Sequence, residues 1–143
     1  EDTFAAGRSM GGYGAGKLGL AASETFSAVA SLSGGLDVTS LKGRHGERSP
    51  LFEGIFGDLD KVKGSENDLF YLAEKLKESG KPLPKMYQWC GTEDFLYEDN
   101  LKMRDHLRKL GYDLTYEESP GDHQWKYWDE KIQTVINWLP IAK

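Results

Sequence analysis

The chain has 143 residues, 38% of them hydrophobic and 29% charged, and this length is typical of one packed domain. The formal net charge is −5 and no basic patch stands out, so the composition argues against a nucleic-acid partner. No apolar run is long enough to span a membrane, and the single Cys90 excludes an intrachain disulfide and a multi-cysteine metal site. No signal-peptide pattern stands at residue 1, and we expect a cytoplasmic location with no cofactor and no membrane partner.

The first half of the chain predicts a strand, a helix and a second strand in close succession. Residues 3–6 are typical of the end of a buried strand, residues 15–22 of a helix, and residues 26–32 of a second buried strand. This order predicts a parallel pair with a right-handed crossover. Residues 36–64 are irregular, with one short helix around 51–56. We interpret 36–64 as a lid-like excursion over the carboxyl edge of the sheet, the alternative being an ordinary surface loop.

The second half of the chain predicts three helices that alternate with two strands. Leucines recur at helical spacing in the first of these helices, which Ser65 or Asn67 can cap and Gly80 ends. The expected elements are a helix at 67–79, a strand at 85–90, a helix at 98–110, a strand at 112–118 and a helix at 125–138. The whole order predicts an α/β fold with about four mostly parallel strands and flanking helices.

A glycine-rich turn lies between the first strand and the first helix. Residues 7–11, Gly-Arg-Ser-Met-Gly, match Gly-x-Ser-x-Gly, which in this position is the pattern of a nucleophile elbow. A serine on such a strained turn needs very small neighbours, and glycines flank Ser9 on both sides. We expect Gly12 and Gly14 to let the helix begin close to the sheet. The pattern also arises by chance in a glycine-rich chain, so Ser9 needs partners.

Candidate partners for Ser9 follow the third and fourth predicted strands. Asp94 and His123 come in the order serine, acid, histidine that an α/β-hydrolase arrangement requires. The alternatives are Glu93 as the acid, Asp94 as a helix cap and His123 as a surface-loop residue. The favoured interpretation is that His123 takes the proton of Ser9, Asp94 holds the imidazole, and water cleaves an acyl-enzyme. The backbone N–H of Met10 is the expected oxyanion donor.

Three other reactive side chains fit a catalytic role less well. His45 lies in the irregular segment, where it is either a pocket wall or a plain loop residue. His106 lies in the middle of a predicted helix among charged neighbours, which indicates a solvated face. Cys90 ends the third predicted strand and is expected to be a core residue.

Taken together, the motifs resemble the "putative esterase" branch of the α/β hydrolases, which includes tributyrin esterase-like carboxylesterases and the S-formylglutathione hydrolase/esterase D group. The matching stretches are residues 6–15, 32–34, 91–96 and 120–125 with Trp128, which together reach across essentially the whole chain. The resemblance implies a Ser9–Asp94–His123 triad in a serine carboxylesterase acting on short-chain or small acyl esters. One departure is Asp122, where such proteins often have glycine; it is expected to alter the loop or add charge near the imidazole.

Members of this branch are about twice as long, so we expect this chain to be the C-terminal part of a single, longer α/β-hydrolase domain. Residues 3–6 would then lie at a sheet edge or pair with another chain, either the missing N-terminal half or a second copy. The second oxyanion donor would come from the missing part. Thioester hydrolysis, acyl transfer, and an inactive fragment with half an oxyanion hole are the alternatives to ester hydrolysis.

Overall fold

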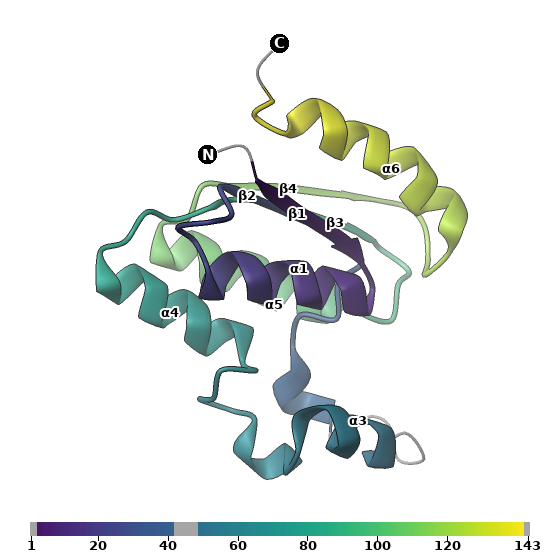
Figure 1. Cartoon of the computed structure of the whole chain (residues 1–143). Helices are drawn as coiled ribbons and strands as arrows, with labels where there is room; N and C mark the ends of the chain where they lie inside the picture. Colours follow the sequence, from purple (N-terminus) through teal and green to yellow (C-terminus); the bar gives the residue numbers. More distant parts are fainter. Residues whose placement is uncertain (1–2, 42–48, 142–143) are drawn as a thin grey trace.

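The computed structural model describes residues 3–41 and 49–141 and contains one four-stranded parallel sheet (Figure 1). Its strands are β1 (Phe4–Arg8), β2 (Ala28–Leu32), β3 (Lys85–Gly91) and β4 (Leu114–Ser119). They lie side by side in sequence order, and every neighbouring pair is parallel. The carboxyl ends of all four strands therefore meet at one edge of the sheet. The expected α/β architecture is confirmed.

Three helices cover one face of the sheet and one helix covers the other. The helices α1 (Met10–Ala21), α4 (Leu69–Ser79) and α5 (Tyr97–Leu110) lie together, and α6 (Trp125–Trp138) lies opposite them (Figure 1). Each of the first three connects two neighbouring strands, and successive right-handed crossovers in one direction place their helices on the same face. Because α6 follows the last strand, it is free to pack on the other side.

Each face of the sheet has its own apolar core, because side chains alternate between the two faces of a strand. On the three-helix face, Val29 and Met86 of the sheet pack with Leu69, Ala73 and Leu107 of the helices. The core on the α6 face consists of Ala30, Leu32, Tyr87, Trp89, Trp128 and Val135. The central strand β2 contributes to both and is buried along its whole length.

Most of the predicted helix ends are confirmed. Gly80 and Gly111 adopt left-handed conformations that end α4 and α5. The cap of α4 was predicted wrongly, since Asp68 rather than Ser65 or Asn67 accepts the first N–H groups of that helix. The helix α6 has the predicted bounds, whereas α1 begins earlier than predicted, at the residue after Ser9.

The segment between β2 and α4 contains short helical pieces. These are η1 (Val38–Ser40), α3 (Ser49–Phe56) and η3 (Leu59–Lys61), and α3 is the short helix that the sequence predicted. In Figure 1 the segment extends away from the sheet beyond α1. It is tied back to α1 by Phe56, whose ring packs edge-on against Tyr13 with 5.6 Å between centroids.

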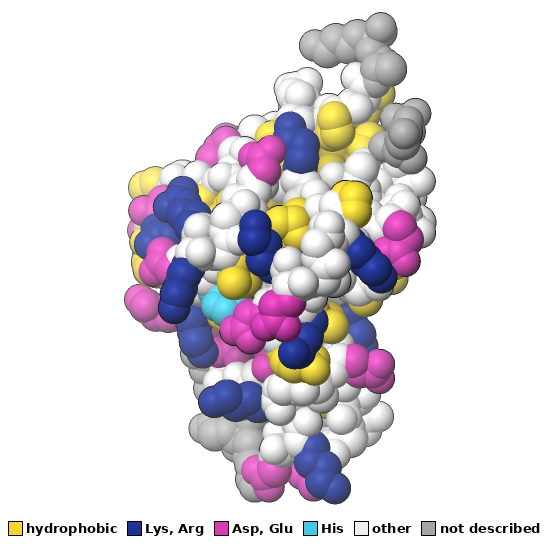
Figure 2. Space-filling view, turned by 90° about the vertical axis from the view of Figure 1, so that its left-hand side faces the viewer, with side chains coloured by type: hydrophobic (Ala, Val, Ile, Leu, Met, Phe, Trp, Pro, Cys, Tyr) yellow, Lys and Arg dark blue, Asp and Glu magenta, His cyan; other side chains and the backbone are white. Residues whose placement is uncertain are grey.

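The edge strands, the surface charge and the length of the helices are relevant to the expected protein, nucleic-acid and membrane partners. β1 lies at an edge of the sheet, as expected, and β4 lies at the other. On the face shown in Figure 2, Lys and Arg side chains are interspersed with Asp and Glu side chains rather than gathered into one basic area. Within the described residues, no helix combines the length and apolar character needed to cross a bilayer.

Candidate active site

Ser9 occupies a strained turn between β1 and α1. Its φ of 53° and ψ of −124° lie in a region that residues other than glycine rarely adopt. Two backbone hydrogen bonds hold the turn against the end of β2: Ser9 N–H donates to the Leu32 carbonyl at 3.0 Å, and Gly35 N–H donates to the Ser9 carbonyl at 3.1 Å. The strain and its support are those of a nucleophile elbow.

Only two of the four glycines around this turn are required by close packing. A Cβ atom on Gly7 would lie 2.1 Å from the carbonyl oxygen of Gly11, and one on Gly12 would lie 2.8 Å from Cα of Gly34. These contacts let α1 begin directly against the sheet. Gly14 faces open space, so the expectation that it lets the helix approach the sheet is wrong. Gly11 also faces open space, so the expectation that the turn needs a very small residue on that side of Ser9 is wrong as well.

Ser9, His123 and Asp94 form one continuous chain of hydrogen bonds. Ser9 Oγ lies 2.9 Å from His123 Nε2, and His123 Nδ1 lies 2.9 Å from Asp94 Oδ2. A carboxylate can only accept a hydrogen bond, so Nδ1 carries the ring proton. In the neutral imidazole Nε2 then accepts the proton of the Ser9 hydroxyl. This is the protonation pattern that a serine nucleophile requires.

The sheet brings these three residues together from distant parts of the sequence. Ser9 follows β1, Asp94 follows β3 and His123 follows β4, and all three strands end at the same edge. The Asp94 side chain is fully buried, while His123 is about one-fifth exposed. Leu96 N–H donates to the second oxygen of Asp94 at 2.9 Å, so both carboxylate oxygens have fixed partners.

Two aromatic rings pack against the imidazole of His123. The Phe95 ring lies 4.8 Å from the His123 ring, and the Trp128 ring meets it edge-on at 4.7 Å. Trp128 is fixed in turn, because its indole N–H donates to Ser33 Oγ at 2.9 Å. Neither Trp128 nor Ser33 was given a role on sequence grounds, although a tryptophan five residues after a candidate histidine is a usable signal.

Arg8, the residue before the candidate nucleophile, links β1 to α6. Its guanidinium lies 3.6 Å from the centre of the Trp125 ring and 4.7 Å from that of Trp128. Such stacking is a favourable cation–π contact that an arginine makes better than a lysine. Arg8 therefore connects the turn at Ser9 to α6, the helix that carries Trp128.

Glu93, the alternative acid, does not contact the imidazole. Its carboxylate instead accepts hydrogen bonds from Gly121 N–H, at 2.7 Å, and from the Thr92 hydroxyl. The backbone N–H of Gly121 and the hydroxyl of Thr92 lower the pKa of Glu93. Asp94 is thus the carboxylate that the structure places on His123.

Asp122, the departure from the family pattern, forms hydrogen bonds within its own loop. One Asp122 carboxylate oxygen accepts from the side-chain amide of Gln124 at 2.8 Å, and its carbonyl accepts from Gln124 N–H at 2.9 Å. Both ring nitrogens of His123 already have partners. Asp122 therefore shapes the turn before α6 and does not bind the imidazole.

The remaining reactive side chains lie outside the site. The prediction of a solvated His106 is wrong, because its side chain is only 19% exposed and its ring packs against Phe70 between α4 and α5. Cys90 is confirmed as a core residue, and burial raises the pKa of its thiol to about 12. His45 lies outside the described residues.

A small cavity of about 100 Å³ opens beside Ser9. Most of its wall is apolar, and the lining residues are Ser9, Met10, Gly35, Asp37, Val38, Leu41, Phe52, Phe95, Leu96 and Asp99. Burial alone would raise the pKa of Asp37, but hydrogen bonds from Lys102, at 2.7 Å, and Thr39 outweigh it and hold that pKa below its usual range. The cavity is therefore a mainly apolar recess whose lining includes the buried carboxylate of Asp37, paired with Lys102.

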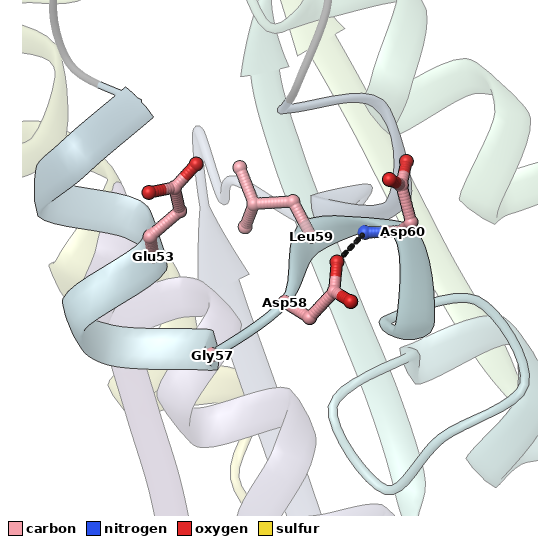
Figure 3. Close-up of a pocket in the computed structure, with 5 residues that line it drawn as sticks. All are labelled: Glu53, Gly57, Asp58, Leu59 and Asp60. Atoms are coloured by element: carbon pink, nitrogen blue, oxygen red, sulfur yellow. Dashed lines mark hydrogen bonds between the residues drawn. The ribbon is translucent and has the colours of Figure 1, made fainter.

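A second, more polar cavity of about 340 Å³ lies on the segment that contains α3 and η3 (Figure 3). It is lined by Glu53, Gly57, Asp58, Leu59 and Asp60, and it shares no lining residue with the cavity beside Ser9. An Asp58 oxygen already accepts the Asp60 N–H at 3.0 Å. In the part of the chain that the structure describes, no group of three or more His, Cys, Asp or Glu side chains is arranged to hold a metal ion.

Comparison with known proteins agrees with this fold. Residues 1–139 match the family described as "Putative esterase", and the chain belongs to that family. An acetyl esterase of Caldicellulosiruptor saccharolyticus is 36% identical over 145 residues, which cover 97% of this chain and 54% of that protein. The resemblance inferred from the motifs is thereby confirmed.

Two solved structures from Staphylococcus aureus are similar to this chain. The S-formylglutathione hydrolase FrmB is 37% identical with a TM-score of 0.83, and the match covers 94% of this chain and 52% of FrmB. The fluorophosphonate-binding serine hydrolase FphF is 38% identical with a TM-score of 0.85, covering 96% of this chain and 53% of FphF. The chain thus spans about half the length of the relatives it matches.

Proposed function

We propose that this chain carries the catalytic triad of a serine hydrolase that cleaves small carboxylic esters. The observation that carries the proposal is the hydrogen-bond chain from Asp94 through His123 to Ser9, with 2.9 Å at each link. Membership of the esterase family supports the same assignment. The proposed substrate is a small-molecule ester, and the proposed chemistry needs no cofactor.

The geometry supports a two-step acyl transfer. Ser9 Oγ attacks the ester carbonyl while its proton moves to His123 Nε2, and buried Asp94 stabilises the resulting imidazolium. The imidazolium then gives this proton to the departing alcohol, which leaves an acyl group on Ser9. In the second step His123 takes a proton from water, the hydroxide attacks the acyl carbon, and the proton returns to Ser9 Oγ. The products are one alcohol and one carboxylic acid.

The oxyanion formed in both steps needs N–H donors. Met10 is the first residue of α1, so its N–H is among the first-turn groups that have no acceptor within the helix. We propose this N–H as one donor, supported by the positive end of the helix dipole. In related hydrolases the second donor lies on a loop after an earlier strand, and within residues 3–41 and 49–141 no strand precedes β1.

The cavity beside Ser9 supports a short acyl group. Its volume of about 100 Å³ compares with about 150 Å³ for an engineered apolar cavity that binds benzene, so it holds roughly four non-hydrogen atoms. Apolar side chains such as Val38, Leu41 and Phe52 form its walls. The alkyl part of an acetyl to butyryl group, one to three carbons beyond the carbonyl, fits this recess. The similarity to FrmB favours thioester hydrolysis on the same site as a second candidate.

The proposal is tested by comparing the chain with its Ser9→Ala variant. We expect a fluorophosphonate probe to label Ser9, as shown by intact mass and peptide mapping, and p-nitrophenyl acetate to be hydrolysed faster than by the variant. Labelling without turnover would favour the fragment with an incomplete oxyanion hole. Absence of labelling on Ser9 would contradict the triad itself. Matched O-acetyl and S-acetyl substrates then separate ester from thioester hydrolysis, and added alcohols reveal acyl transfer.

A further inference from the structure

Glu93 makes a reciprocal pair of hydrogen bonds with one residue of the histidine loop. Its carboxylate oxygen Oε2 accepts from Gly121 N–H at 2.7 Å, and its own N–H donates to the Gly121 carbonyl at 3.0 Å. Both polar backbone groups of Gly121 are thus held by a single residue. Gly121 lies two residues before His123, and Glu93 lies directly before Asp94.

The two loops that Glu93 joins are packed backbone against backbone. A Cβ atom on Gly91 would lie 2.1 Å from the Gly121 carbonyl oxygen, so nothing larger than glycine fits there. Thr92 N–H donates to the Ser119 carbonyl at 3.0 Å and continues the pairing of β3 with β4 into the loops. Gly121 itself has a φ of 153° and lies against the Tyr127 ring. The loop before His123 is therefore shaped by the loop that carries Asp94.

We propose that Glu93 is a positioning residue that holds the backbone conformation of the loop before His123. The two adjacent carboxylates, Glu93 and Asp94, then have different roles. Asp94 binds the imidazole ring of His123, and Glu93 binds the backbone N–H and carbonyl of Gly121, which determine the position of that ring. This inference rests on the proposed function of the triad. Glu93 does not contact the reacting atoms, so it acts on catalysis only through the placement of His123.

The exposure of Glu93 separates this role from that of a buried core residue. Its side chain lies at the surface, so its removal deletes hydrogen bonds without opening a cavity. The hydroxyl of Thr92 and the N–H of Gly121 bind the same carboxylate oxygen. The amide oxygen of a glutamine can take that place, so Glu93→Gln keeps both contacts. Glu93→Ala removes both, and Glu93→Asp is one methylene too short.

The test measures the reactivity of Ser9 and the environment of His123 in the same variants. Misplacement of a catalytic group by about 1 Å can lower a rate about 100-fold. For Glu93→Ala we expect the rate constant of fluorophosphonate labelling to fall about 10- to 100-fold at saturating probe, with the concentration for half-saturation changed less than about threefold. Glu93→Gln should keep the rate within about threefold of the parent chain.

Proton NMR of the His123 Nδ1–H gives a readout that does not depend on turnover. We expect a slowly exchanging downfield resonance in the parent chain and in Glu93→Gln, and its loss or broadening in Glu93→Ala. Glu98→Ala is the matched control, because Glu98 is another exposed carboxylate, in the first turn of α5. It should change neither measurement. Thermal unfolding of each variant shows that the comparison is made between folded chains.

Four results would overturn the proposal. The first is an unchanged labelling rate and an unchanged Nδ1–H resonance in Glu93→Ala. The second and third are a loss of labelling rate in Glu93→Gln, or in the Glu98→Ala control, equal to that in Glu93→Ala. The fourth is a Glu93→Ala variant in which only the probe concentration for half-saturation changes. Should Glu93→Ala fail to fold, Glu93→Asp takes its place with the same expected losses. If Ser9 of the parent chain does not react with the probe, the proposed function fails, while the Nδ1–H resonance still decides the role of Glu93.

Discussion

The substitution Asp94→Asn tests the proton arrangement of the site without changing its shape. In the parent chain one Asp94 oxygen accepts from Leu96 N–H and the other from His123 Nδ1–H, both at 2.9 Å. An asparagine has one acceptor and one donor group in these two places. Leu96 N–H can only donate, so the amide oxygen turns to Leu96 and the amide nitrogen faces His123. Nδ1 must then accept, which moves the ring proton to Nε2, where it blocks the Ser9 hydroxyl.

The size of the effect follows from the burial of Asp94, whose side chain is fully enclosed. To restore the productive tautomer, the amide must turn over and leave Leu96 N–H and its own N–H unpaired. Each buried unpaired donor costs about 1–3 kcal/mol, and the two together cost roughly 2–6 kcal/mol, which reduces the productive population roughly 30- to 20,000-fold. The lost negative charge adds to this, so we expect the labelling rate of Ser9 to fall about 1,000-fold.

Two measurements decide this prediction. The first is the rate of Ser9 labelling by a fluorophosphonate in the parent chain and in Asp94→Asn. The second is nitrogen-15 NMR of the His123 ring, in which a protonated and an unprotonated nitrogen have well-separated shifts. We expect the proton on Nδ1 in the parent chain and on Nε2 in the variant. A variant that keeps the proton on Nδ1, or that labels within tenfold of the parent rate, would refute the reasoning.

Three further predictions concern the cavity, the elbow and the response to pH. Phe52→Ala enlarges the recess beside Ser9 and should move the preferred acyl length of p-nitrophenyl esters from acetyl and butyryl towards hexanoyl or longer; an unchanged preference would remove Phe52 from the acyl site. Gly7→Ala places a Cβ atom against the backbone of α1 and should lower the free energy of unfolding, measured by urea titration, by about 3 kcal/mol. Gly14→Ala lies in open space on α1 and should raise the free energy of unfolding by up to about 1 kcal/mol. The pKa of Asp37 is lowered beside Lys102, so the stabilising contribution of Asp37 is present above about pH 4 and is lost as pH falls through its folded-state pKa. Below about pH 4 the urea midpoint of the parent chain should therefore drop more steeply with pH than that of Asp37→Asn. Parallel plots of midpoint against pH would contradict a stabilising Asp37–Lys102 ion pair.

Local sequence signals located the secondary structure well but could not choose between equivalent caps. Four consecutive residues, 65–68, are all polar, and the sequence predicts Ser65 or Asn67 as the cap of α4. In the structure Ser65 donates its hydroxyl to the Val62 carbonyl, and the side-chain oxygen of Asn67 accepts from Lys17 on α1. Asp68 is left to cap the helix. The choice depends on a contact 50 residues away, which no local pattern contains.

His106 shows the same limit on a helix surface. Its charged neighbours in sequence indicated a face in water, yet its ring lies against Phe70 of the adjacent helix. Periodicity describes which residues share a face of one helix, and it does not state which second helix covers that face. The packing of α5 against α4 decided the environment of His106.

The sequence by itself determined the elements, their order and the candidate triad. Alternating apolar runs and glycine stops located the strands and helices, and the elbow pattern with later strand-end Asp94 and His123 indicated acyl chemistry at Ser9. These signals are local, because turns, caps and hydrophobic periods depend on neighbouring residues. The tertiary structure decided which glycines are close-packed and which of the two adjacent carboxylates, Glu93 or Asp94, meets the imidazole. The direction of a loop side chain is set by the partner loop, and only the parallel sheet brings those loops to one edge.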